Sequence, residues 1–154
     1  MGNIIDQVVA LVDDFELASI FPALDTVIGW VTLFAWLCAL AAPVTMLVLG
    51  LRYRYSPPEK ANYRSGYRFF FGMGSQEAWK YTQQLAGVVW TLLGGGMTVI
   101  MLIVCLFFGL MNPMTMVSVV LWSVGIQLVL IVTGCVVINK KVADRFDKDG
   151  NPKR

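Results

Sequence analysis

The sequence contains no histidine, and its 154 residues include only three cysteines. Histidine is the commonest general base in enzymes and the commonest protein ligand of transition metals. Cys38, Cys105 and Cys135 stand singly in apolar surroundings, without the close spacing that metal and redox sites use. We therefore expect no metal site, no disulfide, no catalytic residue and no cofactor.

Charge is also scarce, because 14% of the residues are charged and 57% are hydrophobic, whereas about 25% are charged in a soluble domain. Two uncharged runs, of 26 and 59 residues, occupy positions 26–51 and 81–139. A transmembrane helix needs about 20 residues, so the first run fits one helix and the second fits two, with a turn at Asn112 and Pro113. The sequence therefore predicts an all-α integral membrane protein with three transmembrane helices, near 27–51, 84–111 and 114–139.

The charges that are present gather in three segments. The first 25 residues carry five carboxylates and no Lys or Arg; the loop 52–83 carries six basic and two acidic residues, and the tail 140–154 six basic and three acidic ones. Basic segments stay on the cytoplasmic side of a membrane. We therefore expect a multi-pass protein of the bacterial cytoplasmic membrane, with its N-terminus outside and its C-terminus in the cytoplasm.

The same pattern divides the chain into consecutive segments. Apolar residues recur at helical spacing before the first span, which predicts an amphipathic helix on the outer membrane surface. The tail is polar, and we expect it to fray after Phe146. The predicted segments are the amphipathic helix 1–25, transmembrane helix 1 at 26–51, the cytoplasmic loop 52–83, transmembrane helices 2 and 3 within 84–139, and the tail 140–154.

Two polar features stand out within the spans. Pro43 has no backbone N–H, so it leaves the carbonyl of Ala39 without its helical hydrogen bond. Gln127 is the only strongly polar residue of the third span, and a buried amide in lipid requires a partner. We favour an interhelical hydrogen bond from Gln127 over a transport site. Because the spans hold no Asp, Glu, Lys or Arg, they also lack the groups that usually couple transport to protons or cations.

The loop 62–79, with the sequence NYRSGYRFFFGMGSQEAW, carries most of the remaining polar chemistry. Ser75 is predicted to cap the helix that carries Trp79 into the second span, with Glu77 in its first turn. Arg64 and Arg68, four residues apart, form with Asn62 and Tyr67 a cluster that suits a phosphate such as a lipid headgroup. The alternative is a structural latch in which Arg68 pairs with Glu77, and we favour the latch.

The order of residues in this loop resembles the SdpI-like immunity family of small bacterial integral membrane proteins. Members have an Asn, a Gly-aromatic-Arg triplet and a Ser-x-Glu-x-Trp-like helix start in a cytoplasmic loop before a span. The similarity covers about 45–139, although three phenylalanines stand here where the family usually has Thr and Pro. The matching positions are Asn62, Gly66, Tyr67, Arg68, Ser75, Glu77 and Trp79.

The resemblance implies protection of the cell against a membrane-active peptide toxin, sometimes joined to sequestration of a transcriptional repressor at the membrane. The expected partners are membrane lipid and a peptide toxin or membrane protein, with an oligomer as a further possibility. The alternative is a small transporter or an accessory subunit of a larger membrane complex. A lipid-active enzyme is disfavoured because no nucleophile is paired with a base. Nucleic-acid binding is not expected, because the basic segments serve as topology determinants.

Overall fold

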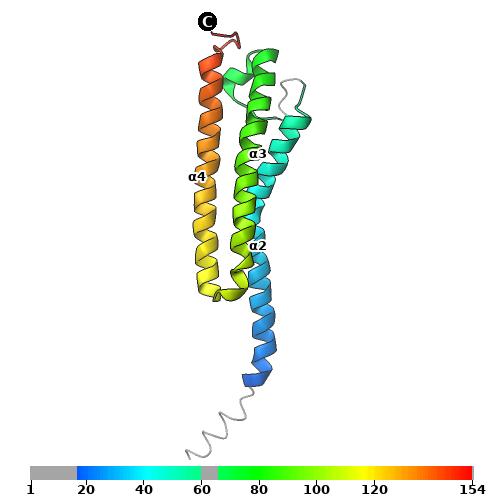
Figure 1. Ribbon diagram of the computed structural model, residues 1–154, viewed down its shortest axis with the longest axis vertical. Helices are drawn as coiled ribbons and strands as arrows, with labels where there is room; N and C mark the ends of the chain where they lie inside the picture. Colours follow the sequence, from blue (N-terminus) through cyan, green and yellow to red (C-terminus); the bar gives the residue numbers. More distant parts are fainter. Residues whose placement is uncertain (1–16, 60–65, 154) are drawn as a thin grey trace, which may run out of the picture.

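The computed structural model describes residues 17–59 and 66–153, and for 17–25 the backbone alone. In this part of the chain three long helices dominate: α2 (Leu17–Tyr55), α3 (Gln76–Leu106) and α4 (Pro113–Arg145). Two short 3₁₀ turns, η1 (Phe70–Met73) and η2 (Phe108–Leu110), precede and follow α3. Figure 1 shows α3 and α4 side by side and antiparallel, and α2 packs mainly against α3.

Three helices in the described part of the chain are long and apolar enough to cross a membrane. They cover Thr26–Tyr55, Gln76–Leu110 and Pro113–Arg145, so the prediction of three spans is confirmed. Asn112 caps α4 through a hydrogen bond from the Thr115 N–H to its side-chain oxygen (2.8 Å), and Pro113 opens the helix. The turn between the second and third spans therefore forms where the sequence placed it.

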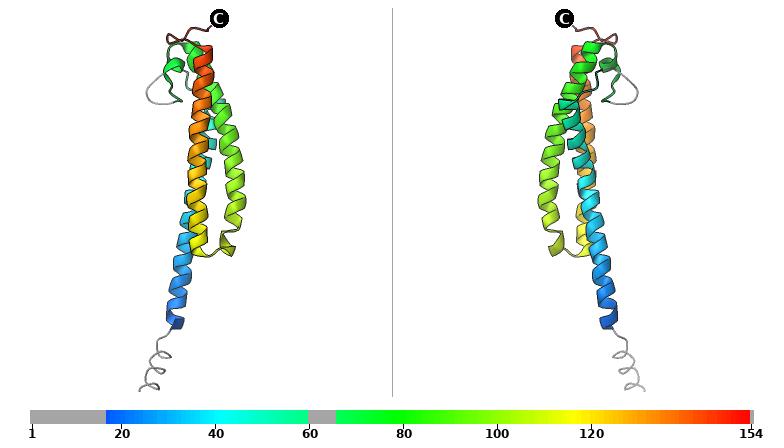
Figure 2. Two further views of the ribbon diagram at one scale, coloured as in Figure 1. Left: turned by 90° about the vertical axis from the view of Figure 1, so that its left-hand side faces the viewer. Right: turned by 90° about the vertical axis from the view of Figure 1, so that its right-hand side faces the viewer.

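The predicted amphipathic helix at 1–25 is not confirmed. Residues 1–16 lie outside the described residues, and residues 17–25 belong to α2, which runs 39 residues without a break. Asp25 does not interrupt the helix, because a single Asp lowers helix propensity without removing a backbone hydrogen bond. The N-terminal part of α2 extends past the turn between α3 and α4 (Figure 2).

Close backbone contact joins α2 to α3. A Cβ atom at Gly94 would lie 2.4 Å from the Leu47 backbone nitrogen, and one at Gly87 would lie 2.8 Å from that of Arg54. From the opposite helix, a Cβ at Gly50 would lie 2.4 Å from the nitrogen of Thr91. Lipid provides no hydrophobic drive for helix association, so small residues that permit this approach stabilise the pair by van der Waals contact.

The interhelical hydrogen bond predicted for Gln127 is confirmed. Its side-chain Nε2 donates to the carbonyl oxygen of Ala39 at 3.0 Å, which ties α4 to α2. This carbonyl is the one that Pro43, four residues later, leaves without a helical partner. Both groups are buried, with Ala39 fully covered and Gln127 3% exposed.

The expectation that the tail frays after Phe146 is wrong. Phe146 is fully buried, and the residues after it turn back so that the Lys153 N–H donates to the Arg145 carbonyl at 2.9 Å. Within the turn, the Asp147 carboxylate accepts hydrogen bonds from the backbone N–H groups of Asn151 (2.7 Å) and Asp149 (3.0 Å). These backbone hydrogen bonds, with that of Asn151 the largest cause, lower the pKa of Asp147. An Asp side chain that accepts hydrogen bonds from the backbone N–H groups that follow it stabilises a turn, and Asp147 does so here.

Replacing Gly94 by Ala is expected to destabilise the protein by about 1–3 kcal/mol, because the added methyl group has to push the backbone of α2 away. Gly96→Ala is the matched control, since a Cβ at Gly96 meets nothing within 4 Å. Thermal unfolding of the purified variants in detergent measures both effects. Equal melting temperatures for the two variants would contradict the backbone contact between α2 and α3.

Candidate functional site

The candidate site lies at the end of the bundle where the loop meets the start of α3, the end of α4 and the C-terminal turn (Figure 1). Asn62 and Arg64 from the predicted cluster lie outside the described residues. The positions from Gly66 to Trp79 are described, and they place the loop against the helices.

The backbone of Tyr67 is held by the side chain of Gln83. The Tyr67 N–H donates to Gln83 Oε1 at 2.8 Å, and Gln83 Nε2 donates to the Tyr67 carbonyl at 2.7 Å. Gln83 is fully buried, so its side-chain amide forms hydrogen bonds with the loop backbone in place of water. It pairs with the N–H and the C=O of one residue, as a neighbouring β-strand would. Leaving both buried amide groups without partners would cost about 1–3 kcal/mol for each group.

The side chain of Tyr67 reaches the third span. Its hydroxyl donates to Asn139 Oδ1 at 2.7 Å and lies 3.4 Å from the Cys135 carbonyl oxygen. Its ring meets the Trp90 ring edge-to-face, with centroids 5.5 Å apart. Burial, followed by the contact with Cys135, raises the pKa of the Tyr67 phenol above its ordinary value. Tyr67 therefore connects the loop, α3 and α4 through one residue.

Gly66 and Trp79 form a second contact. Gly66 has a φ of 107°, a conformation that favours glycine, and a Cβ there would lie 2.8 Å from the Trp79 ring. Trp79 is fully buried, and its indole Nε1 donates to the Pro58 carbonyl at 2.8 Å. Gly66 and Trp79 of the sequence pattern therefore meet in space: the glycine leaves room for the indole, and the indole holds the segment that follows α2.

Ser75 caps α3, as the sequence predicts, and also binds the tail. Its Oγ accepts a hydrogen bond from the Ala78 N–H at 3.1 Å and donates one to the Gly150 carbonyl at 2.6 Å. Gly150 has a φ of 78°, and a Cβ at Gly74 would lie 2.6 Å from the Gly150 nitrogen. The C-terminal turn is therefore packed directly on the start of α3.

Arg68 and Glu77 are both exposed at this end of the molecule. The contacts described above that hold the loop on the helices are those of the Tyr67–Gln83 pair, the Trp79 indole and Ser75, and from here on we call them the latch. The Arg68–Glu77 ion pair that the sequence suggested is not among them. Glu77 lies in the first turn of α3, where the positive end of the helix dipole stabilises a carboxylate.

Sequence reasoning missed Gln83, Asn139 and Gly150 as members of the site. One signal was present, because Trp79, Gln83 and Trp90 recur at positions i, i+4 and i+11, on one face of a helix. Asn139 and Gly150 had no such signal, since their contacts depend on how α4 and the tail fold back onto the loop.

The sequence model of the SdpI/YfhL protein family matches residues 59–138, which is 80 of the 154 residues. The chain belongs to the SdpI/YfhL protein family. The match contains the described loop from Gly66 onward, all of α3 and most of α4, whereas α2 and the C-terminal turn lie outside it. No curated protein and no solved structure in the comparison matches the chain.

Tyr67→Phe is expected to lower the stability of this SdpI/YfhL family member by about 1 kcal/mol at neutral pH, because it removes the hydroxyl that donates to Asn139. The raised pKa makes the effect pH-dependent. Folding favours the neutral phenol, so this stabilisation is complete below the ordinary tyrosine pKa of about 10 and is lost as the pH rises above it.

Melting temperatures in detergent at pH 8 and pH 11 test this prediction, with Tyr55→Phe as the control because the Tyr55 side chain is 76% exposed. The difference between the wild type and Tyr67→Phe should narrow at pH 11, while Tyr55→Phe follows the wild type at both values. A difference that stays constant with pH would contradict the burial of a neutral phenol.

Proposed function

We propose that this chain is a membrane immunity protein that protects the bacterial cytoplasmic membrane against a membrane-active peptide toxin. The observation that carries the proposal is the family match over 59–138, which contains the loop and the α3 residues that anchor it. Three helices suited to crossing a membrane agree with this setting. The absence of charged residues from 81–139 favours a protein that acts by binding over one that moves protons or ions.

The latch supports this proposal, because it holds the loop in one position relative to the helices. The pair formed by the half-buried Tyr67 and the buried Gln83 fixes the described part of the loop on the helices, and the side chains of Arg68, Glu77 and Lys80 are exposed at the same end of the bundle. A rigid scaffold reduces the entropy lost on binding a partner. In the proposed mechanism the loop, or a surface whose shape the loop maintains, recognises the toxin or a membrane partner.

The orientation of the chain is part of the same proposal. The C-terminal end of α2, the N-terminal end of α3 and the C-terminal end of α4 all lie at one end of the bundle, together with the tail (Figure 1). The basic side chains at this end favour a cytoplasmic location under the positive-inside rule. They are Arg52, Arg54, Arg68, Lys80, Lys140, Lys141, Arg145, Lys148 and Lys153.

Cysteine labelling tests this orientation. After the three native cysteines are replaced by Ala, a cysteine introduced by Asn3→Cys is expected to react with a membrane-impermeant maleimide in intact cells. One introduced by Lys148→Cys should react only after lysis, because the tail lies in the cytoplasm. Labelling of both positions in intact cells, or of neither, would place the termini on the same side and refute the proposed topology.

Expression in a sensitive bacterial host is expected to raise tolerance severalfold to a membrane-active peptide made by the species from which this chain comes. Gln83→Leu should abolish the gain, because it removes the amide that holds the loop. Gln84→Leu is the matched control, since the neighbouring Gln84 is exposed and Gln83 is fully buried.

Minimal inhibitory concentrations measure the effect, with immunoblots of the membrane fraction to match protein levels. Equal tolerance with and without the wild-type protein, across the peptides that the species secretes, would refute the immunity function. Equal protection by the two glutamine variants would leave immunity standing but exclude the latch from its mechanism.

A further inference from the structure

Gln127 has one half of its side-chain amide satisfied and the other half without a partner. Nε2 donates to the Ala39 carbonyl, whereas the buried Oε1 has no hydrogen-bond partner in the described part of the chain. The opposite orientation of the amide is excluded, because a carbonyl oxygen facing the Ala39 carbonyl would place two acceptors in contact. Oε1 is therefore an acceptor to which none of the described residues donates a hydrogen bond.

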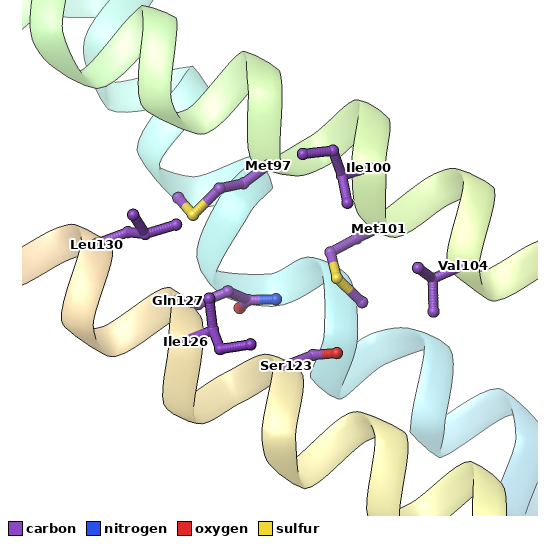
Figure 3. Close-up of a pocket in the computed structure, with 8 residues that line it drawn as sticks. All are labelled: Met97, Ile100, Met101, Val104, Ser123, Ile126, Gln127 and Leu130. Atoms are coloured by element: carbon purple, nitrogen blue, oxygen red, sulfur yellow. The ribbon is translucent and has the colours of Figure 1, made fainter.

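A cavity of about 160 Å³ lies beside this amide, between α3 and α4 (Figure 3). An apolar cavity of about 150 Å³ is large enough to hold benzene. Apart from Gln127 and Ser123 the lining is apolar, and the methionine sulfurs make favourable contacts with aromatic rings. The lining residues are Met97, Ile100, Met101 and Val104 from α3, with Ser123, Ile126, Gln127 and Leu130 from α4.

The depth of the cavity restricts what can supply the donor. Gln127 is 14 residues from Pro113 and 18 from Arg145 at the two ends of α4, which correspond to about 21 Å and about 27 Å along the helix. This position is near the middle of a hydrocarbon core about 30 Å thick. Lipid tails carry no donor, and headgroups are too far away. Water alone is also a poor occupant, because the volume exceeds that of one molecule and the lining offers few polar partners.

We propose that this cavity binds a ring-sized apolar group that carries a single N–H or O–H donor, such as an indole or a phenol. The ring fills the space beside Met97 and Met101, and its donor bonds to Oε1 of Gln127. The same chemistry has two sources: a free aromatic compound dissolved in the membrane, or a Trp or Tyr side chain of a membrane-inserted peptide. The site is separate from the latch and goes beyond the proposed function.

Methyl NMR of the full chain in lipid nanodiscs tests the proposal, with the methionine methyl groups labelled with ¹³C. Titration with indole should shift the Met97 and Met101 signals to saturation through the ring current, while the signal of Met73 in η1, which is not part of the lining, stays in place. For 1-methylindole, which cannot donate, the affinity should be about tenfold weaker, as expected from the loss of one hydrogen bond. The size control is 3-methylindole, which has the same volume and keeps its N–H.

Two variants separate the hydrogen bond from the shape of the cavity. Gln127→Met keeps a side chain of similar size and should bring the affinities for 3-methylindole and 1-methylindole to the same value. Ser123→Phe keeps Gln127 but fills the cavity, so it should abolish saturable binding of every ring compound. Shifts that grow without saturation at all methionine methyls, or equal affinities of the two methylindoles for the wild type, would overturn the proposal.

A second arm identifies the source of the ring. A synthetic transmembrane peptide of Leu and Ala with one central Trp is added to the nanodiscs, and a peptide with a central Phe is the control. Saturable shifts with the Trp peptide alone, reversed by indole, would assign the site to a peptide side chain. Shifts with free indole but with neither peptide would assign it to a free compound. No saturable shift in either arm would refute the site.

Discussion

The pairing of the Gln83 amide with the backbone of Tyr67 is the contact on which the end of the bundle that carries the loop and the tail depends. The Gln83 side chain accepts a hydrogen bond from the Tyr67 N–H and donates one to the Tyr67 carbonyl, so it holds the loop backbone through both groups of one residue. Once the Tyr67 backbone is held, its phenol lies between Trp90 and Asn139 and joins the second and third spans. The described part of the loop, from Gly66 onward, is therefore held against the helices.

The same requirement, that polar groups find partners where water is absent, also shapes the middle of the bundle. Pro43 leaves a carbonyl unpaired in the first span, and Gln127 from the third span donates to it. The hydrogen bonding of Gln127 is incomplete, because none of the described residues donates to its Oε1, which lies beside an apolar cavity. A buried polar atom without a partner is costly, so a ligand that supplies a donor to it would gain a hydrogen bond on binding.

The two halves of the molecule suggest different contributions to function. At the end that carries the loop and the tail, uncharged residues build the latch, and the arginine and glutamate of the family pattern are exposed. In the membrane, α2 and α3 are joined through glycine contacts, while α3 and α4 leave room between them for the cavity.

The sequence by itself determined the number of spans, the turn at Asn112 and the cap at Ser75, because uncharged runs and capping residues act over short distances along the chain. It also identified the loop, since the family pattern lies within one contiguous stretch. Only the tertiary structure decided that Gln83 holds Tyr67, that the tail turns back onto Ser75, and that Gln127 meets Ala39. These contacts join residues on different elements, and their formation depends on how the helices pack, which local patterns do not encode.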